Sequence, residues 1–85
     1  MSLELLAIDK DKNIYNRETQ LWRCRNVSAI RVDTMNEGIE KASNNQFLYI
    51  GINADNINYM PKLRILREAT NDPILISTTS YTMQE

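Results

Sequence analysis

Short apolar runs alternate with amphipathic stretches along this chain. Four runs have the length of strands, residues 3–8, 27–32, 47–52 and 72–78. Three stretches between them have helical spacing of apolar residues, residues 13–26, 34–45 and 59–70. Continuous apolar runs favour strands buried on both faces, and strands that alternate with helices favour a parallel sheet with right-handed crossovers. The pattern therefore predicts a three-layer, doubly wound α/β domain.

Two of the predicted helices carry recognisable start signals. Thr34 is followed three residues later by Glu37, the spacing of a capping box in which each side chain satisfies a free backbone amide. Asn58 precedes the last helix as its expected cap, and Pro61 falls in the first turn, where the missing amide costs little. The final residues, "SYTMQE", are expected to begin a further helix.

Composition places the chain among ordinary globular domains. Its 85 residues suffice for one domain or part of one, and 42% of them are hydrophobic. The net charge of −1 gives no basic face for a nucleic-acid backbone, and no apolar run approaches a membrane span. The single cysteine, Cys24, forms no internal disulfide and is expected to be a half-buried helix thiol. With no secretory signal, a reducing cytoplasmic setting is the simplest interpretation.

The chain lacks the residues of several common kinds of active site. It has no histidine, which removes the most frequent general base and transition-metal ligand. It also has no glycine-rich phosphate loop after a strand. Ligands of parallel sheets bind beyond the carboxyl ends of the strands. The residues expected there are Asp9, Lys10 and Asp11, residues 51–55, and Thr78 with Thr79.

Three segments together resemble the receiver domain of bacterial two-component response regulators. They are "LLAIDKDK", "FLYIGINADNINYMPKLRILRE" and "DPILISTTS". The resemblance implies a flavodoxin-like sheet of strand order 2-1-3-4, with the family's fifth strand missing, so that residues 1–85 form an incomplete domain. In that family a carboxylate after strand three accepts a phosphoryl group from a histidine kinase. Two acids after strand one hold Mg²⁺, and a hydroxyl residue and a lysine contact the phosphoryl oxygens.

Carried over by residue, the resemblance implies a degenerate phosphoryl site. Counting back from "LRILRE" puts Gly51 at the position of the phosphoryl acceptor. Asp9 matches the first metal-binding acid, Lys10 replaces the second, and Thr78 matches the hydroxyl residue. A glycine has nothing to phosphorylate, and an ammonium group repels Mg²⁺, although Lys10 could itself neutralise Asp9. We therefore expect a non-enzymatic regulatory module from a transcriptional regulator, with no catalytic residue, no metal and no cofactor, Mg²⁺ included.

Two other functions stay open from the sequence. A phosphoryl-accepting receiver could use Asp9, Asp11 or Asp55 in place of the lost acceptor. A small α/β protein-interaction domain would need none of this chemistry. The expected partners are proteins, either a sensor histidine kinase or an output domain of the same chain. Without a fifth strand, the fourth would be an open apolar edge that pairs with another chain, so self-association or a longer natural chain is also expected.

Overall fold

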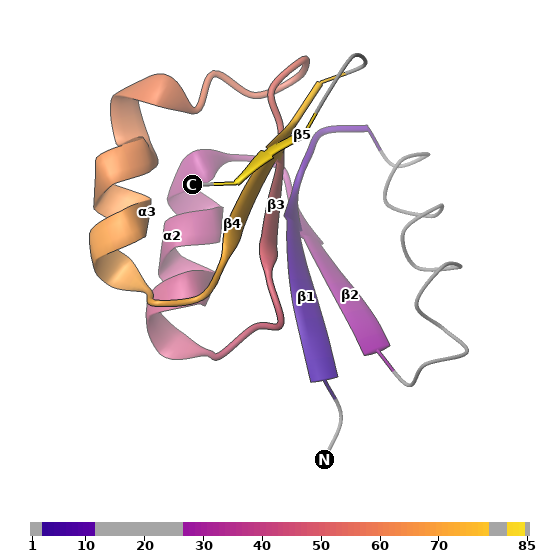
Figure 1. Ribbon diagram of the computed structural model, residues 1–85, viewed down its shortest axis with the longest axis vertical. Helices are drawn as coiled ribbons and strands as arrows, with labels where there is room; N and C mark the ends of the chain where they lie inside the picture. Colours follow the sequence, from indigo (N-terminus) through magenta and orange to yellow (C-terminus); the bar gives the residue numbers. More distant parts are fainter. Residues whose placement is uncertain (1–2, 12–26, 79–81, 85) are drawn as a thin grey trace.

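The parallel sheet predicted from the sequence is present in the computed structural model of the chain, which describes residues 3–11, 27–78 and 82–84 (Figure 1). Its parallel strands are β1 (Leu3–Ile8), β2 (Val27–Val32), β3 (Ile50–Asn53) and β4 (Ile74–Ser77). They lie in the order β2-β1-β3-β4. This order confirms an α/β sheet compatible with a flavodoxin-like fold. The first two strands have the predicted bounds.

The expected open edge at β4 is occupied by another strand. Residues Thr82–Gln84 form β5, which pairs antiparallel with β4 in the register Ile76↔Met83. The prediction that "SYTMQE" begins a helix is therefore wrong, and so is the prediction that β4 lies open. Among the described residues, the sheet has five strands rather than four. The edge of the described sheet lies at β5 instead of β4, and self-association stays a prediction.

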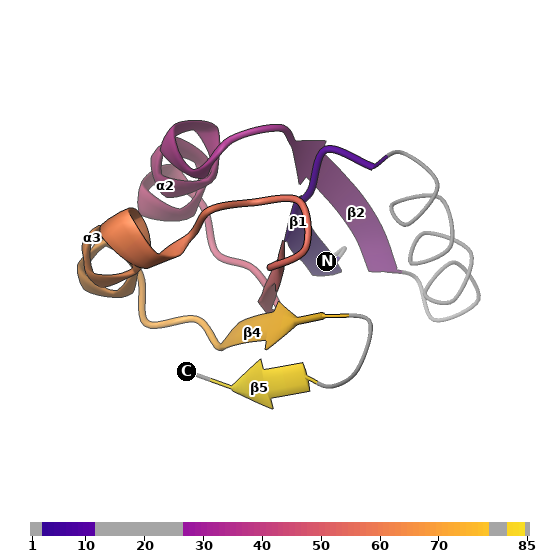
Figure 2. The same ribbon diagram turned by 90° about the horizontal axis from the view of Figure 1, so that it is seen from above.

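Two helices cover the same face of the sheet (Figure 2). Helix α2 spans Met35–Asn44 and begins as predicted, because Thr34 Oγ1 accepts a hydrogen bond of 3.2 Å from the Glu37 amide. The last helical segment begins with a short 3-10 turn, η1 (Met60–Lys62), and continues as α3 (Leu63–Ala69). The predicted cap at Asn58 is wrong, since the turn starts after Tyr59 and neither η1 nor α3 has a side-chain cap.

The main core lies between these helices and the sheet. It is formed by alternate residues of the central strands together with apolar residues of α2 and α3; among them are Leu6, Ile8, Ile50, Ile52, Ile74, Ile76, Met35, Ala42 and Leu66. Helix α2 lies close to β1 at Gly38, where an added Cβ would lie 2.3 Å from Ile8 Cδ1. A side chain at this position would therefore push α2 away from the sheet.

The opposite face of the sheet carries a second apolar cluster. Leu5, Ala7 and Val27 are buried there, with Tyr49 packed against them. The helix predicted for residues 13–26, which includes Cys24, lies outside the described residues, as does Thr79. The described parts thus comprise the sheet and one helical layer, and no helix among them is long and apolar enough to cross a bilayer.

Strand β3 begins three residues later than predicted. Phe47 is buried but lies outside β3. Its amide donates a 2.8 Å hydrogen bond to the carboxylate of Asp72, in the loop before β4. The backbone oxygen of Asp72 in turn accepts a hydrogen bond from Arg67 at the end of α3. These contacts tie together the entries to β3 and β4 at the amino edge of the sheet. The candidate site lies at the opposite, carboxyl edge of the sheet.

Candidate functional site

A buried carboxylate lies at the carboxyl end of β1. Asp9 follows β1 directly and is only 3% exposed, the one buried charged residue in the described parts of the chain. Its carboxylate accepts hydrogen bonds from three donors. These are the side-chain amides of Asn53 at 3.0 Å and Asn56 at 2.9 Å, and the backbone amide of Asp11 at 2.8 Å. Such donors offset the large cost of removing a charged carboxylate from water.

The sheet register explains why these side chains meet. Ile8 of β1 pairs with Ile52 of β3 in the parallel ladder. The next residue of each strand, Asp9 and Asn53, therefore emerges side by side at the same edge. Both are the first polar residues after apolar runs, so the chain changes from core to site at the same level in the two strands.

The loop after β3 fixes the orientation of the Asn53 side chain. Asn53 Oδ1 accepts a 3.0 Å hydrogen bond from the Asp55 backbone amide, and its backbone oxygen accepts from the amides of Asn56 and Ile57. This turn leaves the Nδ2 group of Asn53 to donate to Asp9. The same turn places Asn56 so that its amide reaches the other carboxylate oxygen. Asn53 thus uses both ends of its amide, one to hold the turn and one to hold Asp9.

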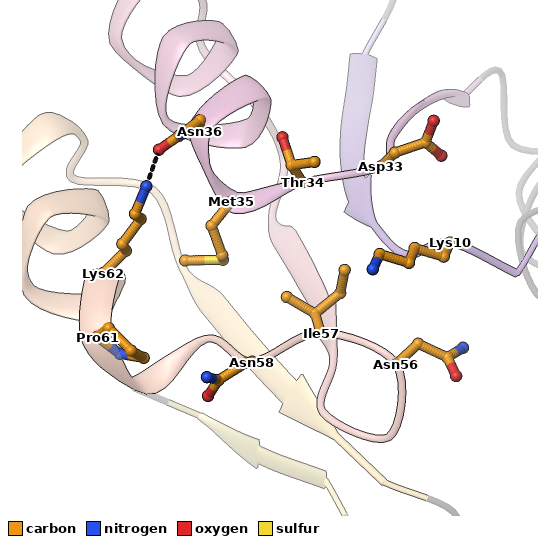
Figure 3. A pocket seen from close by; sticks show the side chains of 10 residues that line it. All are labelled: Lys10, Asp33, Thr34, Met35, Asn36, Asn56, Ile57, Asn58, Pro61 and Lys62. Atoms are coloured by element: carbon orange, nitrogen blue, oxygen red, sulfur yellow. Dashed lines mark hydrogen bonds between the residues drawn. The ribbon is translucent and has the colours of Figure 1, made fainter.

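A cation lies near the backbone of Asp9 but does not contact its carboxylate. Arg31 of β2 donates a 3.0 Å hydrogen bond to the backbone oxygen of Asp9 and forms an ion pair with Asp33. No ion pair joins Lys10 to Asp9, so Lys10 does not neutralise Asp9 through direct contact. Lys10 is exposed, and its side chain extends toward a neighbouring pocket instead (Figure 3).

The placement of Gly51 at the tip of strand three is wrong. Gly51 lies inside β3, paired with Ala7, and the strand continues for two more residues to Asn53. A Cβ at Gly51 would contact the Tyr49 ring at 3.4 Å, on the face of the sheet opposite α2 and α3. The residue at the tip, beside Asp9, is Asn53. The sequence prediction missed Asn53 by two positions. Asn53 is the first polar residue after its apolar run, and the same signal identifies Asp9.

The side chains of the other predicted site residues are not among the groups that hydrogen-bond to the Asp9 carboxylate. Thr78 comes one residue after β4, and the strand ends at Ser77, which pairs with Asn53. Asp55 is exposed in the turn after β3, and Asp11 contributes its backbone amide to Asp9. In the part of the chain that the structure describes, no three acidic or cysteine side chains gather as metal ligands.

A surface pocket of about 310 Å³ adjoins the Asp9 network at the same edge. It is bounded by the loops after β1, β2 and β3 and by the first residues of α2 and η1 (Figure 3). The lining residues are Lys10, Asp33, Thr34, Met35, Asn36, Asn56, Ile57, Asn58, Pro61 and Lys62. Asn56 belongs to both features, because it lines the pocket and donates to Asp9.

Comparison with known proteins gives no identification: no family model, curated protein or solved structure matches the chain.

Proposed function

We propose that this chain is a regulatory, receiver-like module of a two-component response regulator that works without being phosphorylated in the usual way. One observation carries the proposal, the hydrogen bond of 3.0 Å from Asn53 Nδ2 to the buried carboxylate of Asp9. In a phosphoryl-accepting receiver, the residue at this strand tip would have to be a carboxylate. An asparagine has almost the same shape but lacks the anionic oxygen that attacks phosphorus.

The amide also removes the need for a metal ion. Two carboxylates about 4 Å apart repel one another by roughly 4 kcal/mol at an effective dielectric of 20, so an acidic pair needs a cation between its members. Asn53 replaces this repulsion with a donated hydrogen bond to Asp9. With Asn56 and the Asp11 amide, the carboxylate is satisfied by protein groups alone. This arrangement supports a module that keeps one conformation in the absence of Mg²⁺.

Of the three acids of the phosphoryl-accepting alternative, Asp9, Asp11 and Asp55, Asp55 is the exposed one and Asp11 is partly buried. Both carboxylate oxygens of Asp9 accept hydrogen bonds from the protein, whereas Asp55 is exposed in the turn after β3. Asp55 is two residues beyond the strand tip, and its side chain belongs to the surface rather than to the Asp9 network. An attack by Asp55 would therefore proceed without the alignment that Asp9 provides.

The partners proposed for the module are proteins. A non-phosphorylated receiver would act on an output domain of its own chain, most often a transcription factor's DNA-binding domain, or would associate with a sensor histidine kinase. The proposed location is the cytoplasm, where such regulators act. A small α/β protein-interaction domain of another lineage would share the fold and would use the same acid and amide only to hold the ends of β1 and β3 together.

Mass spectrometry of the intact protein tests the proposal. The chain is incubated with a small acyl phosphate and Mg²⁺, and a phosphorylatable receiver serves as the positive control. We expect no gain of a phosphoryl group under conditions that label the control. A stoichiometric gain that disappears in Asp55→Asn would establish the alternative acceptor and overturn the proposal.

A further inference from the structure

We propose that the pocket between Lys10 and Lys62 binds a small aliphatic dicarboxylate lengthwise, with one carboxylate at each lysine. The carbon chain of the ligand lies across Met35 and Ile57. Figure 3 shows the two lysines at opposite sides of the pocket, with these two apolar side chains between them. Each ammonium group meets its own carboxylate, so the two positive charges stay apart. The proposal does not depend on the regulatory role proposed above.

An ammonium group marks one end of the pocket. The Nζ group of Lys62 donates a hydrogen bond to Asn36 Oδ1, and both residues line the pocket (Figure 3). This bond holds the ammonium at the Asn36 end, and two of its three N–H donors remain for a ligand. Asn36 accepts the bond through its oxygen, which leaves its NH₂ group as a further donor. This end therefore offers a positive charge and a neutral donor to one carboxylate.

Lys10 supplies the positive charge at the other end. Its side chain is exposed and extends toward the pocket (Figure 3). The acidic residue of the lining, Asp33, forms no ion pair with Lys10, because it is paired with Arg31 of β2 instead. The ammonium group of Lys10 therefore stays within reach of a second carboxylate.

The middle of the pocket is apolar. Met35 and Ile57 are 6% and 5% exposed and belong to the main core, so packing fixes their positions. Methylene groups that lie on such a surface lose contact with water, which favours binding. The pocket volume of about 310 Å³ lies near the lower end of the range of about 300–1,000 Å³ for ligand pockets. This size suits an unbranched ligand of a few carbons.

The order of groups along the pocket is cation, apolar floor, cation. A monocarboxylate can reach one of the two lysines, and an uncharged chain can use the apolar floor alone. A diamine would place like charges beside both lysines. A dicarboxylate is the simplest molecule in which the complementary order, anion, apolar chain, anion, occurs along its length.

Amide chemical shifts and calorimetry of the 85-residue chain test the site with acids of matched length. The dicarboxylates run from succinate to suberate, and each is paired with the unbranched monocarboxylate of the same number of carbons. We expect one dicarboxylate to bind about two- to fivefold more tightly than its monocarboxylate, because the second carboxylate adds one partly exposed ion pair. Dicarboxylates too short to span the two lysines should lack this advantage. The shifted amides should belong to residues 10–11, 34–36 and 56–62, and 1,6-diaminohexane should not bind.

Three variants locate the two carboxylates. In Lys10→Gln and in Lys62→Gln, the best dicarboxylate should bind about as tightly as its monocarboxylate, because one lysine remains. The ratio of the two affinities is the readout, so a general loss of stability does not imitate this result. Lys41→Gln, in the last turn of α2 and outside the pocket, is the matched control and should keep the ratio of the parent chain.

Three results would overturn the proposal. The first is the absence of saturable dicarboxylate binding up to about 10 mM, beyond the range of a weak small-ligand site. The second is equal affinity for dicarboxylates and monocarboxylates at every length. The third is an affinity ratio that stays unchanged in Lys10→Gln or Lys62→Gln, or that falls equally in Lys41→Gln, because the carboxylates would then bind elsewhere on the surface.

Discussion

Asn53 and Asp9 are joined by a hydrogen bond of 3.0 Å between residues that lie 44 positions apart in the sequence. The bond connects the carboxyl ends of β3 and β1, the two central parallel strands. It couples a neutral donor to a buried carboxylate at the carboxyl edge of the sheet. At this contact the Asp9 carboxylate therefore lies beside a neutral amide group and not beside a second charge.

Changing Asn53 to aspartate should destabilise the protein in the absence of divalent metal. Asn53→Asp removes one donor to Asp9 and places a second anion beside it. We expect a loss of about 2–4 kcal/mol in the free energy of unfolding, from the lost hydrogen bond and the like-charge repulsion. Urea unfolding at neutral pH measures the loss, and added Mg²⁺ should restore part of it by binding between the two carboxylates.

The exposed residue Asn58 provides the control for that experiment. Asn58→Asp makes the same chemical change in the loop before η1, where no hydrogen bond to Asp9 is lost. Its unfolding free energy should change by no more than about 0.5 kcal/mol and should not respond to Mg²⁺. Equal behaviour of the two variants would contradict a special role for the Asn53–Asp9 contact.

Neutralising Asp9 should also weaken the fold. In Asp9→Asn, an amide NH₂ group replaces one carboxylate oxygen. This donor would then face another donor, from Asn53, Asn56 or the Asp11 backbone. We expect destabilisation of about 1–3 kcal/mol, the cost of leaving a buried donor without an acceptor. Asp55→Asn, which alters an exposed carboxylate, should lie within about 0.5 kcal/mol of the parent. Thermal or urea unfolding that ranks the two variants equally would count against the network.

The close approach of α2 to β1 predicts an unusual response to alanine. Replacing glycine by alanine inside a helix normally stabilises the helix by about 1 kcal/mol. A Cβ at Gly38, however, would lie 2.3 Å from Ile8 Cδ1 and 2.8 Å from its Cγ1. Ile8 is fully buried within the main core. We therefore expect Gly38→Ala to be destabilising by about 1–3 kcal/mol despite the gain in helix propensity.

A second substitution tests this steric explanation. Ile8→Val removes the Cδ1 atom that an alanine at position 38 would meet. In a double-mutant cycle, Gly38→Ala should cost less in the Ile8→Val background than in the parent, giving a favourable coupling of about 0.5–2 kcal/mol. Additive effects would show that the cost of Gly38→Ala arises from some other contact.

The start of α2 should depend on the hydroxyl group of Thr34. Thr34→Ala removes the acceptor of the Glu37 amide and should destabilise the protein by about 1 kcal/mol. Thr34→Ser keeps that acceptor and should recover most of the loss. Unfolding midpoints of the three proteins check the prediction, which fails if serine and alanine are equally destabilising.

The strands and the first cap were predictable because local sequence dominates there. Residues 3–8 form an almost continuous apolar run, residues 27–32 are short and rich in β-branched side chains, and the Thr34–Glu37 spacing is that of a capping box. Beyond them, non-local contacts decide the outcome. Phe47 extends an apolar run but is held by Asp72, and residues 82–84 pair with β4 although their sequence permits a helix start.

The candidate site was predictable at Asp9 but not at its partner. Asp9 marks the end of its strand through the change from apolar to polar residues. The same signal at Asn53 was overridden by counting back from the following helix, which assumed that the loop after β3 has the family's length. The first helical segment there begins with a 3-10 turn at Met60, so distances counted from the helix do not fix the strand end.

Asn56 borders the pocket and also holds the Asp9 carboxylate, so a single side chain belongs to two separate parts of the carboxyl edge. Binding of a molecule in the pocket and the stability of the Asp9 network are thermodynamically linked whenever Asn56 adopts different positions in the empty and the occupied pocket. The linkage acts in both directions: a molecule that draws Asn56 toward itself loosens the end of β1, and a substitution at Asp9 changes how readily the pocket fills.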